Sequence, residues 1–250
     1  SWLETVHARD TVEQNPMSGT LYGIGLGPGD PDLMTLKAHR LISAAKVVAY
    51  PAPDTGDSFA RSIAAEAISS NALEVPIVIP MRVTRFPAQA VYDEAAAAIG
   101  THLDGGTDVA VLCEGDPFFY GSFMYLFGRL AEKHKAEIVP GVTSMTACAA
   151  MAARPLCARN EILTVIPAPI EEALLRDRLQ ASGAAVIMKV GKHLAKVRRV
   201  IEDLNLTDRS IYVAHASLPQ QAVVPLIDAP DTAPYFSMIL IGGTDPYAKS

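Results

Sequence analysis

Three turns that contain glycine and proline carry the residues of this sequence best suited to chemistry. They comprise residues 23–30 (GIGLGPGD), 113–121 (CEGDPFFYG) and 139–144 (VPGVTS). Together they offer backbone polar groups, carboxylates, hydroxyls and aromatic rings. This combination favours a polar small molecule that carries an aromatic ring but no phosphate.

The first turn does not fit G-x-G-x-x-G, the fingerprint of dinucleotide-binding proteins. Counting from Gly23 places Pro28 at the third glycine, and counting from Gly25 places Asp30 there. Pro28 has no N–H to donate to a phosphate, and the carboxylate of Asp30 would repel one. A nicotinamide-dependent oxidoreductase is therefore disfavoured. Two interpretations stay open: a ligand-facing loop with a carboxylate at its tip, and a tight turn that needs positive φ.

Alternating strands and helices in the first half of the chain must position these turns. Because each turn follows an expected strand, each could line the same cleft at a carboxyl edge, where ligands bind in open α/β proteins. The alternation predicts a parallel sheet, and helices should cover both of its faces. Pro51 and Pro53 are expected to end the second strand. The expected strands are 21–26, 46–50, 77–81 and 108–113, and the expected helices are 35–45, 58–69 and 88–103.

The second half predicts a different sheet. Its last three strands follow one another without helices, so this sheet should be mixed or partly antiparallel. We place the boundary between two α/β domains near Tyr120, which gives domains 17–120 and 121–250. Residues 1–16 are polar and unperiodic, and we expect them to be a leader or an added extension. The expected strands are 137–139, 161–166, 185–190, 211–215, 222–227 and 235–241, and the expected helices are 123–133, 170–181 and 194–204.

Composition excludes several classes of function. The 21 Lys and Arg residues against 27 Asp and Glu residues give a net charge of −6, which lacks the basic footprint of a nucleic-acid-binding protein. No apolar run approaches the ~20 residues of a membrane span. The three cysteines form no CxxC pair, and the six histidines are dispersed. We therefore expect a cytoplasmic protein with free thiols and no metal site.

The combination of motifs is more specific than any single turn. The run GIGLGPGDPDLMTLKA, followed by VVAYP, CEGDPFFYG and VPGVTS, resembles the tetrapyrrole methyltransferases, the class III S-adenosylmethionine-dependent family. The resemblance extends from about Gly19 to Gly243. Within the family, AYPAP, SFARSIA, PMRVTRFPAQAVYDEAA and LCEGDPFFYGSFMYLFGRL are similar to members that methylate precorrin-2 at carbon 20.

This resemblance implies a fold and a set of contacts. The fold would be two α/β domains with the active site in the cleft between them, assembled as a homodimer. S-adenosyl-L-methionine would be the cofactor and S-adenosyl-L-homocysteine the product left from it. Glu114 and Met145 depart from the patterns of neighbouring subgroups. The implied cofactor contacts fall on Pro28, Glu114, Gly115, Asp116, Phe119, Thr143, Ser144, Met188 and Ala216.

Methyl transfer from a sulfonium needs alignment and exclusion of water rather than a protein nucleophile. A proton must then leave the methylated carbon, and the candidate bases are Asp30 and Glu114. Tyr120 could orient the base or a pyrrole. Simpler roles stay open: Asp30 could cap the next helix, Asp116 could hold its own turn, and Phe119 could belong to the core.

The implied substrate carries many acetate and propionate carboxylates, which Arg or Lys must meet. Because the net charge is −6, the positive field must be local to the site. Arg82 and Arg85 are the expected source, with Lys189 and Lys192 among weaker candidates. Tyr50 is a candidate substrate contact, although packing at a strand end would explain it as well.

The resemblance therefore implies S-adenosylmethionine-dependent methylation of precorrin-2 at carbon 20, giving precorrin-3A on the route to cobalamin. The same methylation on a cobalt-containing substrate is the nearest alternative, because no protein metal ligand is expected either way. A non-catalytic tetrapyrrole-binding protein that keeps the fold is a second alternative.

Overall fold

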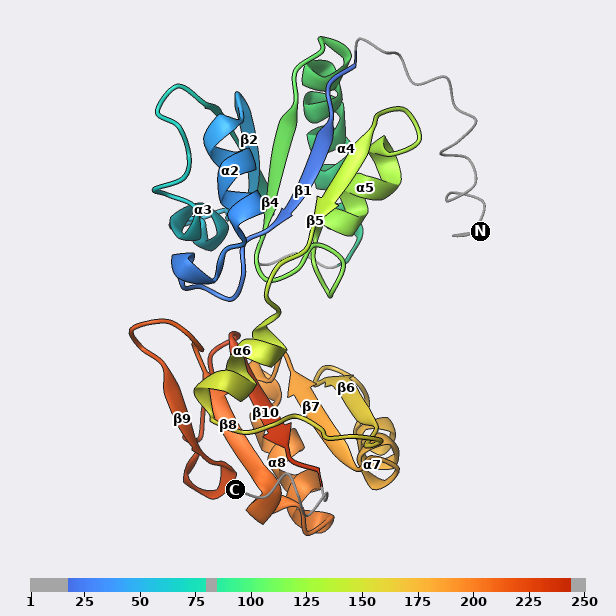
Figure 1. Ribbon diagram of the computed structural model, residues 1–250. Coiled ribbons are helices and arrows are strands. Elements are labelled where there is room, and N and C mark those ends of the chain that lie inside the picture. Colours follow the sequence, from blue (N-terminus) through green and yellow to red (C-terminus); the bar gives the residue numbers. More distant parts are fainter. Residues whose placement is uncertain (1–17, 80–84, 244–250) are drawn as a thin grey trace. The chain divides into compact units, whose positions relative to one another are not determined.

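The computed structural model describes residues 18–79 and 85–243, without the side chains of residues 85–88. The chain divides into two compact units, Ser1–Thr143 and Ser144–Ser250 (Figure 1). The division therefore falls after Thr143 and not near Tyr120, where we expected it. The reason is the short strand β5 (Ala136–Val139), which pairs with β1 (Leu21–Gly25) and so belongs to the first sheet.

The first unit contains a five-stranded sheet in the order β3-β2-β4-β1-β5. All its strand pairs are parallel, as the alternating pattern predicted. β4 is buried along its whole length, because a parallel sheet is covered on both faces. The remaining strands are β2 (Val47–Pro53), β3 (Leu73–Ile79) and β4 (Val109–Cys113).

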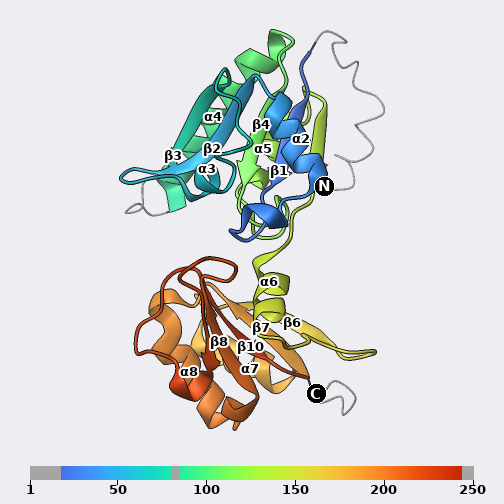
Figure 2. The same ribbon diagram turned by 60° about the vertical axis from the view of Figure 1, so that its left-hand side comes forward.

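Helices cover both faces of this sheet, as predicted (Figure 2). One core contains Ile42 and Ile63 from α2 and α3, and the other contains Ile99 and Leu126 from α4 and α5. The helices are α2 (Leu36–Ala44), α3 (Phe59–Ile63), α4 (Arg85–Asp104) and α5 (Phe123–Leu130). α3 is much shorter than the expected helix 58–69, and turns follow it.

Prolines do not end β2, contrary to our expectation. β2 continues through Pro51 to Pro53, paired with β3 up to Ile79. Its pairing with β4 stops at Ala49, so the proline positions lie where β2 has a neighbour on one side only. A proline is tolerated there because its missing N–H leaves no gap in a ladder. Pro76 is tolerated for the same reason within β3, which is an edge strand.

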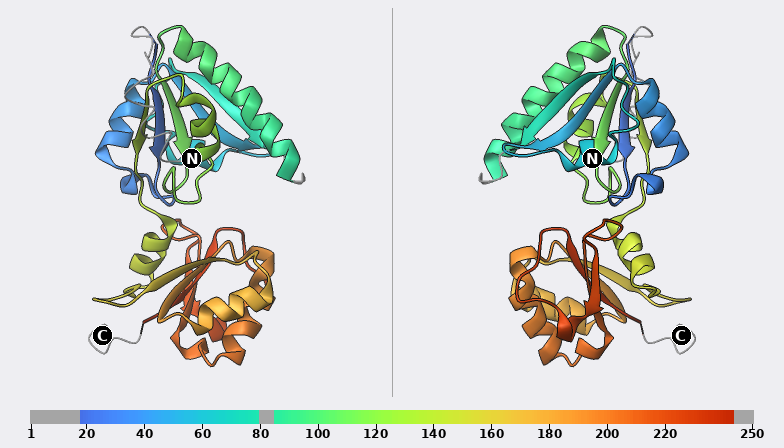
Figure 3. Two further views of the ribbon diagram at one scale, coloured as in Figure 1. Left: turned by 90° about the vertical axis from the view of Figure 1, so that its right-hand side faces the viewer. Right: turned by 90° about the vertical axis from the view of Figure 1, so that its left-hand side faces the viewer.

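The second unit contains a mixed sheet in the order β6-β7-β10-β8-β9, with its strands labelled in Figure 1 and seen from two further sides in Figure 3. β6 and β7 are parallel, whereas β10 runs antiparallel to both β7 and β8, which confirms the prediction. α7 and α8 pack on one face and α6 on the other. The strands are β6 (Leu163–Pro167), β7 (Ala184–Met188), β8 (Ser210–Ala214), β9 (Ala222–Pro225) and β10 (Ser237–Ile241). The helices are α6 (Ser144–Met151), α7 (Glu172–Gln180) and α8 (Leu194–Asp203).

Among the helices of the described residues, none combines the length and the apolar character needed to cross a membrane.

Candidate functional site

The three turns meet at the carboxyl edge of the first sheet. They leave β4, β1 and β5, which are neighbours in the sheet, so all three emerge side by side. We call residues 26–30, 114–121 and 140–143 the turn cluster. This grouping is the one that the sequence predicted.

Backbone hydrogen bonds join the first two turns. Leu26 N donates to Cys113 O at 2.9 Å, which continues the ladder beyond β1. Gly27 and Gly115 then exchange two bonds: Gly27 N to Gly115 O at 3.2 Å and Gly115 N to Gly27 O at 2.7 Å. Both glycines have positive φ, 83° and 64°, in the region that favours glycine. The expectation of a turn with positive φ is therefore confirmed, together with a contact between two turns.

The third turn packs directly on the backbone of the other two. A Cβ on Gly25 would lie 2.6 Å from Gly141 N and 2.7 Å from Gly115 O. A Cβ on Gly141 would overlap the Gly115 carbonyl oxygen and lie 2.9 Å from Gly25 Cα. Three glycines from three turns thus bring main chain against main chain. Sequence reasoning missed this role of Gly25 and Gly141, although glycine at both turns was a signal.

The carboxylate of Asp116 ties the second turn to the third. Its Oδ1 accepts hydrogen bonds from Phe118 N at 2.9 Å and from Phe119 N at 3.1 Å. Its Oδ2 accepts one from Gly141 N at 3.0 Å. Asp116 therefore holds its own turn, as one interpretation had it, and also positions a second turn. Both carboxylate oxygens are engaged, so we assign this side chain a positioning role.

Glu114 is a carboxylate of the turn cluster whose pKa is changed by its surroundings. Its side chain is partly buried, and the loss of contact with water raises the pKa of its carboxyl above the ordinary value. Backbone N–H groups, including that of Ala60 near the start of α3, stabilise the charge and oppose this shift. A carboxylate with a raised pKa is suited to accept a proton near neutral pH.

Asp30 is the N-cap of the short helix Pro31–Leu33, and its Oδ1 accepts a hydrogen bond from Asp32 N at 2.9 Å. Asp30 thus caps this unexpected 3-10 helix, whereas the expected helix, α2, has Thr35 as its N-cap. A role of Asp30 as base stays a prediction. Tyr120 is exposed, and its ring contacts the ring of Phe119 edge-on at 5.1 Å. Its φ of 56° is unusual for a bulky residue and is typical of strained functional turns. Phe119 and Pro28 are partly exposed, so neither belongs to the core.

The remaining predicted cofactor contacts lie at the end of the first unit and in the second unit. Thr143 is the last residue of the first unit, and Ser144 begins α6. Met188 is the last residue of β7, and Ala216 follows β8; both are buried. The structure therefore places Met188 and Ala216 at one edge of the second sheet.

Tyr50 belongs to a polar network on the first unit. Its hydroxyl donates to Glu74 Oε2 at 2.8 Å, and Arg61 binds the same carboxylate at 2.7 and 2.9 Å. The ring is buried, so packing accounts for much of its position, as the alternative proposed. Arg82 lies outside the described residues. Arg85 begins α4, and its side chain lies outside the described part as well.

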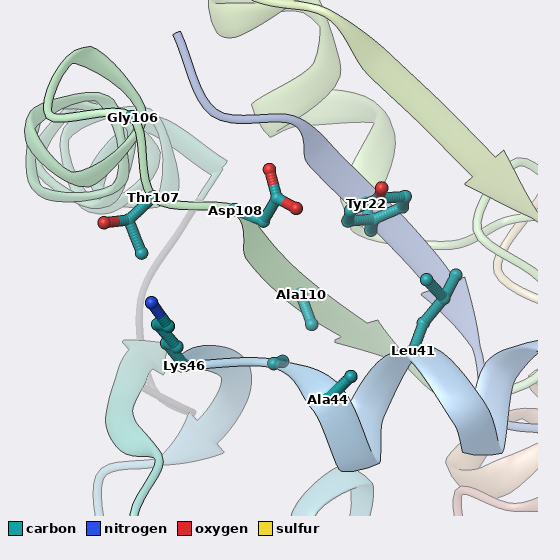
Figure 4. Close-up of a pocket in the computed structure, with 9 residues that line it drawn as sticks. Tyr22, Leu41, Ala44, Lys46, Gly106, Thr107, Asp108 and Ala110 are labelled. Atoms are coloured by element: carbon teal, nitrogen blue, oxygen red, sulfur yellow. The ribbon is translucent and has the colours of Figure 1, made fainter. Parts of the chain in front are cut away.

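A separate pocket lies at the opposite edge of the first sheet, where β2 and β4 begin (Figure 4). Its volume is about 220 Å³, and it holds the charged side chains of Lys46 and Asp108. The turn cluster lies at the carboxyl edge of this sheet, after β4, β1 and β5, so this pocket is not the predicted site. Among the described residues, no group of three or more His, Cys, Asp or Glu could hold a metal ion.

Comparison with known proteins defines the class. The family model described as Tetrapyrrole (Corrin/Porphyrin) Methylases matches residues 20–228. The chain belongs to this family, which is a family of methyltransferases.

Curated relatives narrow the comparison. The precorrin-2 C(20)-methyltransferase of Sinorhizobium sp. is 38% identical over 90% of this chain and 96% of its own length. The cobalt-precorrin-2 C(20)-methyltransferase of Salmonella typhimurium is 32% identical over 93% of this chain and 100% of its own length. The cobalamin biosynthesis protein CobIJ of Mycobacterium tuberculosis is 42% identical over 90% of this chain. The chain spans only 46% of CobIJ, about half of that relative.

Solved structures confirm the fold. Cobalt precorrin-4 methyltransferase (CbiF) has a TM-score of 0.69 and 27% identity, with 92% of this chain and 95% of that chain covered. The uroporphyrin-III C-methyltransferase of Thermus thermophilus, solved with S-adenosyl homocysteine, has a TM-score of 0.65 and 23% identity, covering 89% and 97% of the two chains.

Proposed function

We propose that this protein transfers a methyl group from S-adenosyl-L-methionine to carbon 20 of precorrin-2, giving precorrin-3A in cobalamin biosynthesis. The observation that carries the proposal is the turn cluster, which sits at the ligand-binding edge of a tetrapyrrole methylase fold. The 38% identity to the Sinorhizobium enzyme over nearly its whole length supports this particular reaction.

The residues of the turn cluster fit the proposed cofactor. A Cβ placed on Gly115 would meet nothing within 4 Å, so a ligand can approach the main chain there. Phe119 offers a partly exposed ring, and Glu114 offers a carboxylate beside open backbone. We therefore propose that Pro28, Glu114, Gly115, Asp116 and Phe119 contact the cofactor through backbone and ring. Thr143, Ser144, Met188 and Ala216 are proposed as its further contacts.

The chemistry assigns clear tasks to the chain. The bound cofactor supplies an electrophilic methyl group on a sulfonium. The macrocycle carbon forms the new bond as the sulfur–methyl bond breaks, and the proton on carbon 20 must then leave. We propose that Glu114 accepts this proton, because its raised pKa brings its basicity closer to working pH. Asp30 remains a proposed second candidate for the base, and Tyr120 is proposed to orient the base or a pyrrole. The close contacts at the glycines hold the three turns against one another.

Glu114→Gln is expected to lower kcat by about one hundred- to ten-thousand-fold, the usual contribution of a general base. The wild-type rate should fall as the pH falls through the raised pKa of Glu114, because the protonated carboxyl cannot accept a proton. The variant should lose this acidic limb of the pH–rate profile. An unchanged limb in Glu114→Gln would assign it to another group.

Glu114→Gln should also change how the free energy of unfolding depends on pH. Because the folded protein holds the Glu114 proton more tightly than the unfolded chain, stability should fall as the pH rises from the ordinary pKa of glutamate to the raised value. Glu114→Gln should flatten that slope in urea titrations across this window. A steeper slope in the variant would contradict the shift.

Methyl transfer itself tests the proposed function. Incubation with S-adenosylmethionine and enzymatically prepared precorrin-2 should give one S-adenosylhomocysteine per methyl group gained, measured by mass spectrometry. Absence of methyl gain under conditions in which the protein is folded would reject the proposal.

A cobalt-containing substrate is the second candidate, favoured by the likeness to the Salmonella enzyme along its full length. Turnover of metal-free precorrin-2 should exceed that of the cobalt form, as the higher identity to the Sinorhizobium enzyme suggests. The reverse ratio would assign the chain to the cobalt-dependent route.

We further propose that Arg82, Arg85 and Tyr50 contact the substrate, and that the protein is a cytoplasmic homodimer that binds neither nucleic acid nor membrane. Cys113, Cys148 and Cys157 are all free, which fits a reducing compartment.

A further inference from the structure

One edge of the second sheet gathers three segments that are distant in sequence. β7 and β8 end at this edge, and β10, which runs antiparallel to both, begins there (Figures 1 and 2). Met188 pairs with Met238, and Ala214 pairs with Ser237. We call residues 189–193, 215–217 and 235–236, which lie beyond these strand ends, the cationic edge.

The backbone of the cationic edge is strained. Lys189, His215 and Ser217 have φ values of 58°, 49° and 68°, in a region of backbone conformation that residues other than glycine rarely adopt. They are three of the seven such residues other than glycine within the described ranges. Strain of this kind costs about 1–3 kcal/mol for each residue and clusters at ligand sites. The segments that follow β7 and β8 therefore share this strained backbone.

The segment before β10 fixes both strained segments. His215 N donates to Phe236 O at 2.9 Å, and Val190 N donates to Ser237 O at 3.4 Å. The Ser237 hydroxyl donates to Pro234 O at 2.6 Å and accepts a hydrogen bond from Gly191 N at 3.4 Å. These hydrogen bonds hold the main chain of the cationic edge in place. The main chain therefore loses little conformational freedom when a ligand binds.

The charge of this edge is of one sign. Residues 189–193 (KVGKH), 215–217 (HAS) and 235–236 (YF) contain two lysines and two histidines but no Asp or Glu, in a chain of net charge −6. Burial lowers the pKa of His193, and the nearby charges of Lys196 and Lys192 lower it further. Asp231, an acidic residue nearby in sequence, lies 3.9 Å from Arg198.

Two aromatic rings complete the cationic edge. Tyr235 and Phe236 are 64% and 45% exposed, and their rings meet edge-on at 5.4 Å. Exposed aromatic rings beside cations suit a ligand that has both apolar faces and carboxylates at its rim. A tetrapyrrole with acetate and propionate side chains has this chemistry.

We propose that the cationic edge binds carboxylates of the tetrapyrrole substrate, with Lys189 and His215 as the principal donors and Tyr235 and Phe236 as apolar contacts. This inference rests on the proposed function for the identity of the substrate. Buried Met188 and Ala216 are the sequence neighbours of Lys189 and His215. At each of these strand ends, a proposed cofactor contact and a proposed substrate contact would therefore be consecutive residues. The donors would set affinity for the substrate without taking part in the methyl transfer.

Lys189→Gln and His215→Gln test the assignment. Each should raise KM for precorrin-2 about tenfold, and the double variant about a hundredfold, because each removes a charge-assisted hydrogen bond to a carboxylate. kcat should change less than about threefold, since this binding is uniform between ground state and transition state. Lys189→Arg should restore most of the affinity. Lys133→Gln removes an exposed lysine charge after α5, away from the cationic edge, and should leave KM unchanged.

A second probe separates this inference from the proposed function. Uroporphyrin, a fluorescent tetrapyrrole polycarboxylate, should bind the wild-type protein in the presence of S-adenosylhomocysteine and bind the double variant about a hundredfold more weakly. Loss of uroporphyrin affinity in a protein that does not methylate precorrin-2 would uphold the site and reject the function. Normal KM and uroporphyrin affinity in folded, active variants would overturn the site. Weaker S-adenosylhomocysteine binding by calorimetry, with unchanged uroporphyrin binding, would overturn it too, by assigning these residues to the cofactor.

Discussion

Gly141→Ala is expected to abolish measurable binding of S-adenosylhomocysteine and to lower the free energy of unfolding by about 3 kcal/mol, the upper part of the usual range for overpacking. The added methyl group would overlap the Gly115 carbonyl oxygen and come within 2.9 Å of Gly25 Cα. Both neighbours are main-chain atoms, which cannot rotate away as a side chain could. The third turn would have to separate from the other two, and the proposed cofactor contacts would separate with it.

Gly128→Ala is the matched control for this prediction. Gly128 lies in α5, and a Cβ there would meet nothing within 4 Å. Alanine should stabilise the helix by about 0.5–1 kcal/mol and leave cofactor affinity unchanged. Titration calorimetry and urea unfolding of both variants measure the two effects. Retention of wild-type S-adenosylhomocysteine affinity by Gly141→Ala would show that close contact between the turns is not needed for the site.

Asp116→Ala should have the second large effect. It removes the acceptor of three backbone hydrogen bonds, from Phe118, Phe119 and Gly141. Hydrogen bonds to a charged acceptor contribute about 1.5–3 kcal/mol each when buried, and these are partly exposed and not additive. We therefore expect a loss of about 2–3 kcal/mol in unfolding free energy and a cofactor affinity at least about tenfold weaker. Asp116→Asn should lie between, because the amide keeps one oxygen but turns an N–H₂ group toward one of its partners.

Asp108→Ala is the control that tells a specific effect on the turn cluster from a general weakening of the first sheet. Asp108 also accepts a backbone hydrogen bond, from Thr20 N at 2.6 Å, but at the opposite edge of the same sheet. Its loss should cost less stability than the loss of Asp116 and should leave S-adenosylhomocysteine binding intact. Equal loss of cofactor binding in both variants would indicate that any weakening of the first sheet disturbs the site, and would remove the special role of Asp116.

The sheet of the first unit could be predicted because its strands are apolar and short and alternate with helices. β4 is the clearest case, since VAVLC is buried throughout. The prolines of β2 were misleading, because their effect depends on which neighbour a strand has at that point, and the sequence does not state this. The domain boundary was misplaced for a similar reason. The four residues Ala136–Val139 form β5, which pairs with β1. The sequence of so short a strand does not indicate which of the two sheets it joins.

The candidate site could be predicted as a group of turns, but its internal contacts could not. Carboxyl ends of parallel strands share an edge, which brought the three turns together on general grounds. The bond from Gly141 N to Asp116 depends on the register of β5 against β1 and of β1 against β4, which local patterns do not fix. Tyr50 illustrates the same limit. Its partner Glu74 lies on β3, which begins at Leu73 and not at residue 77, where the strand was expected.

Methyl transfer from S-adenosylmethionine labelled with ¹³C in its methyl group tests the central claim most directly. The folded protein is incubated with metal-free precorrin-2, and the product is examined by NMR. We predict one labelled methyl group, attached to carbon 20, with stoichiometric S-adenosylhomocysteine. A label on any other carbon, or no label in the macrocycle, would contradict the account.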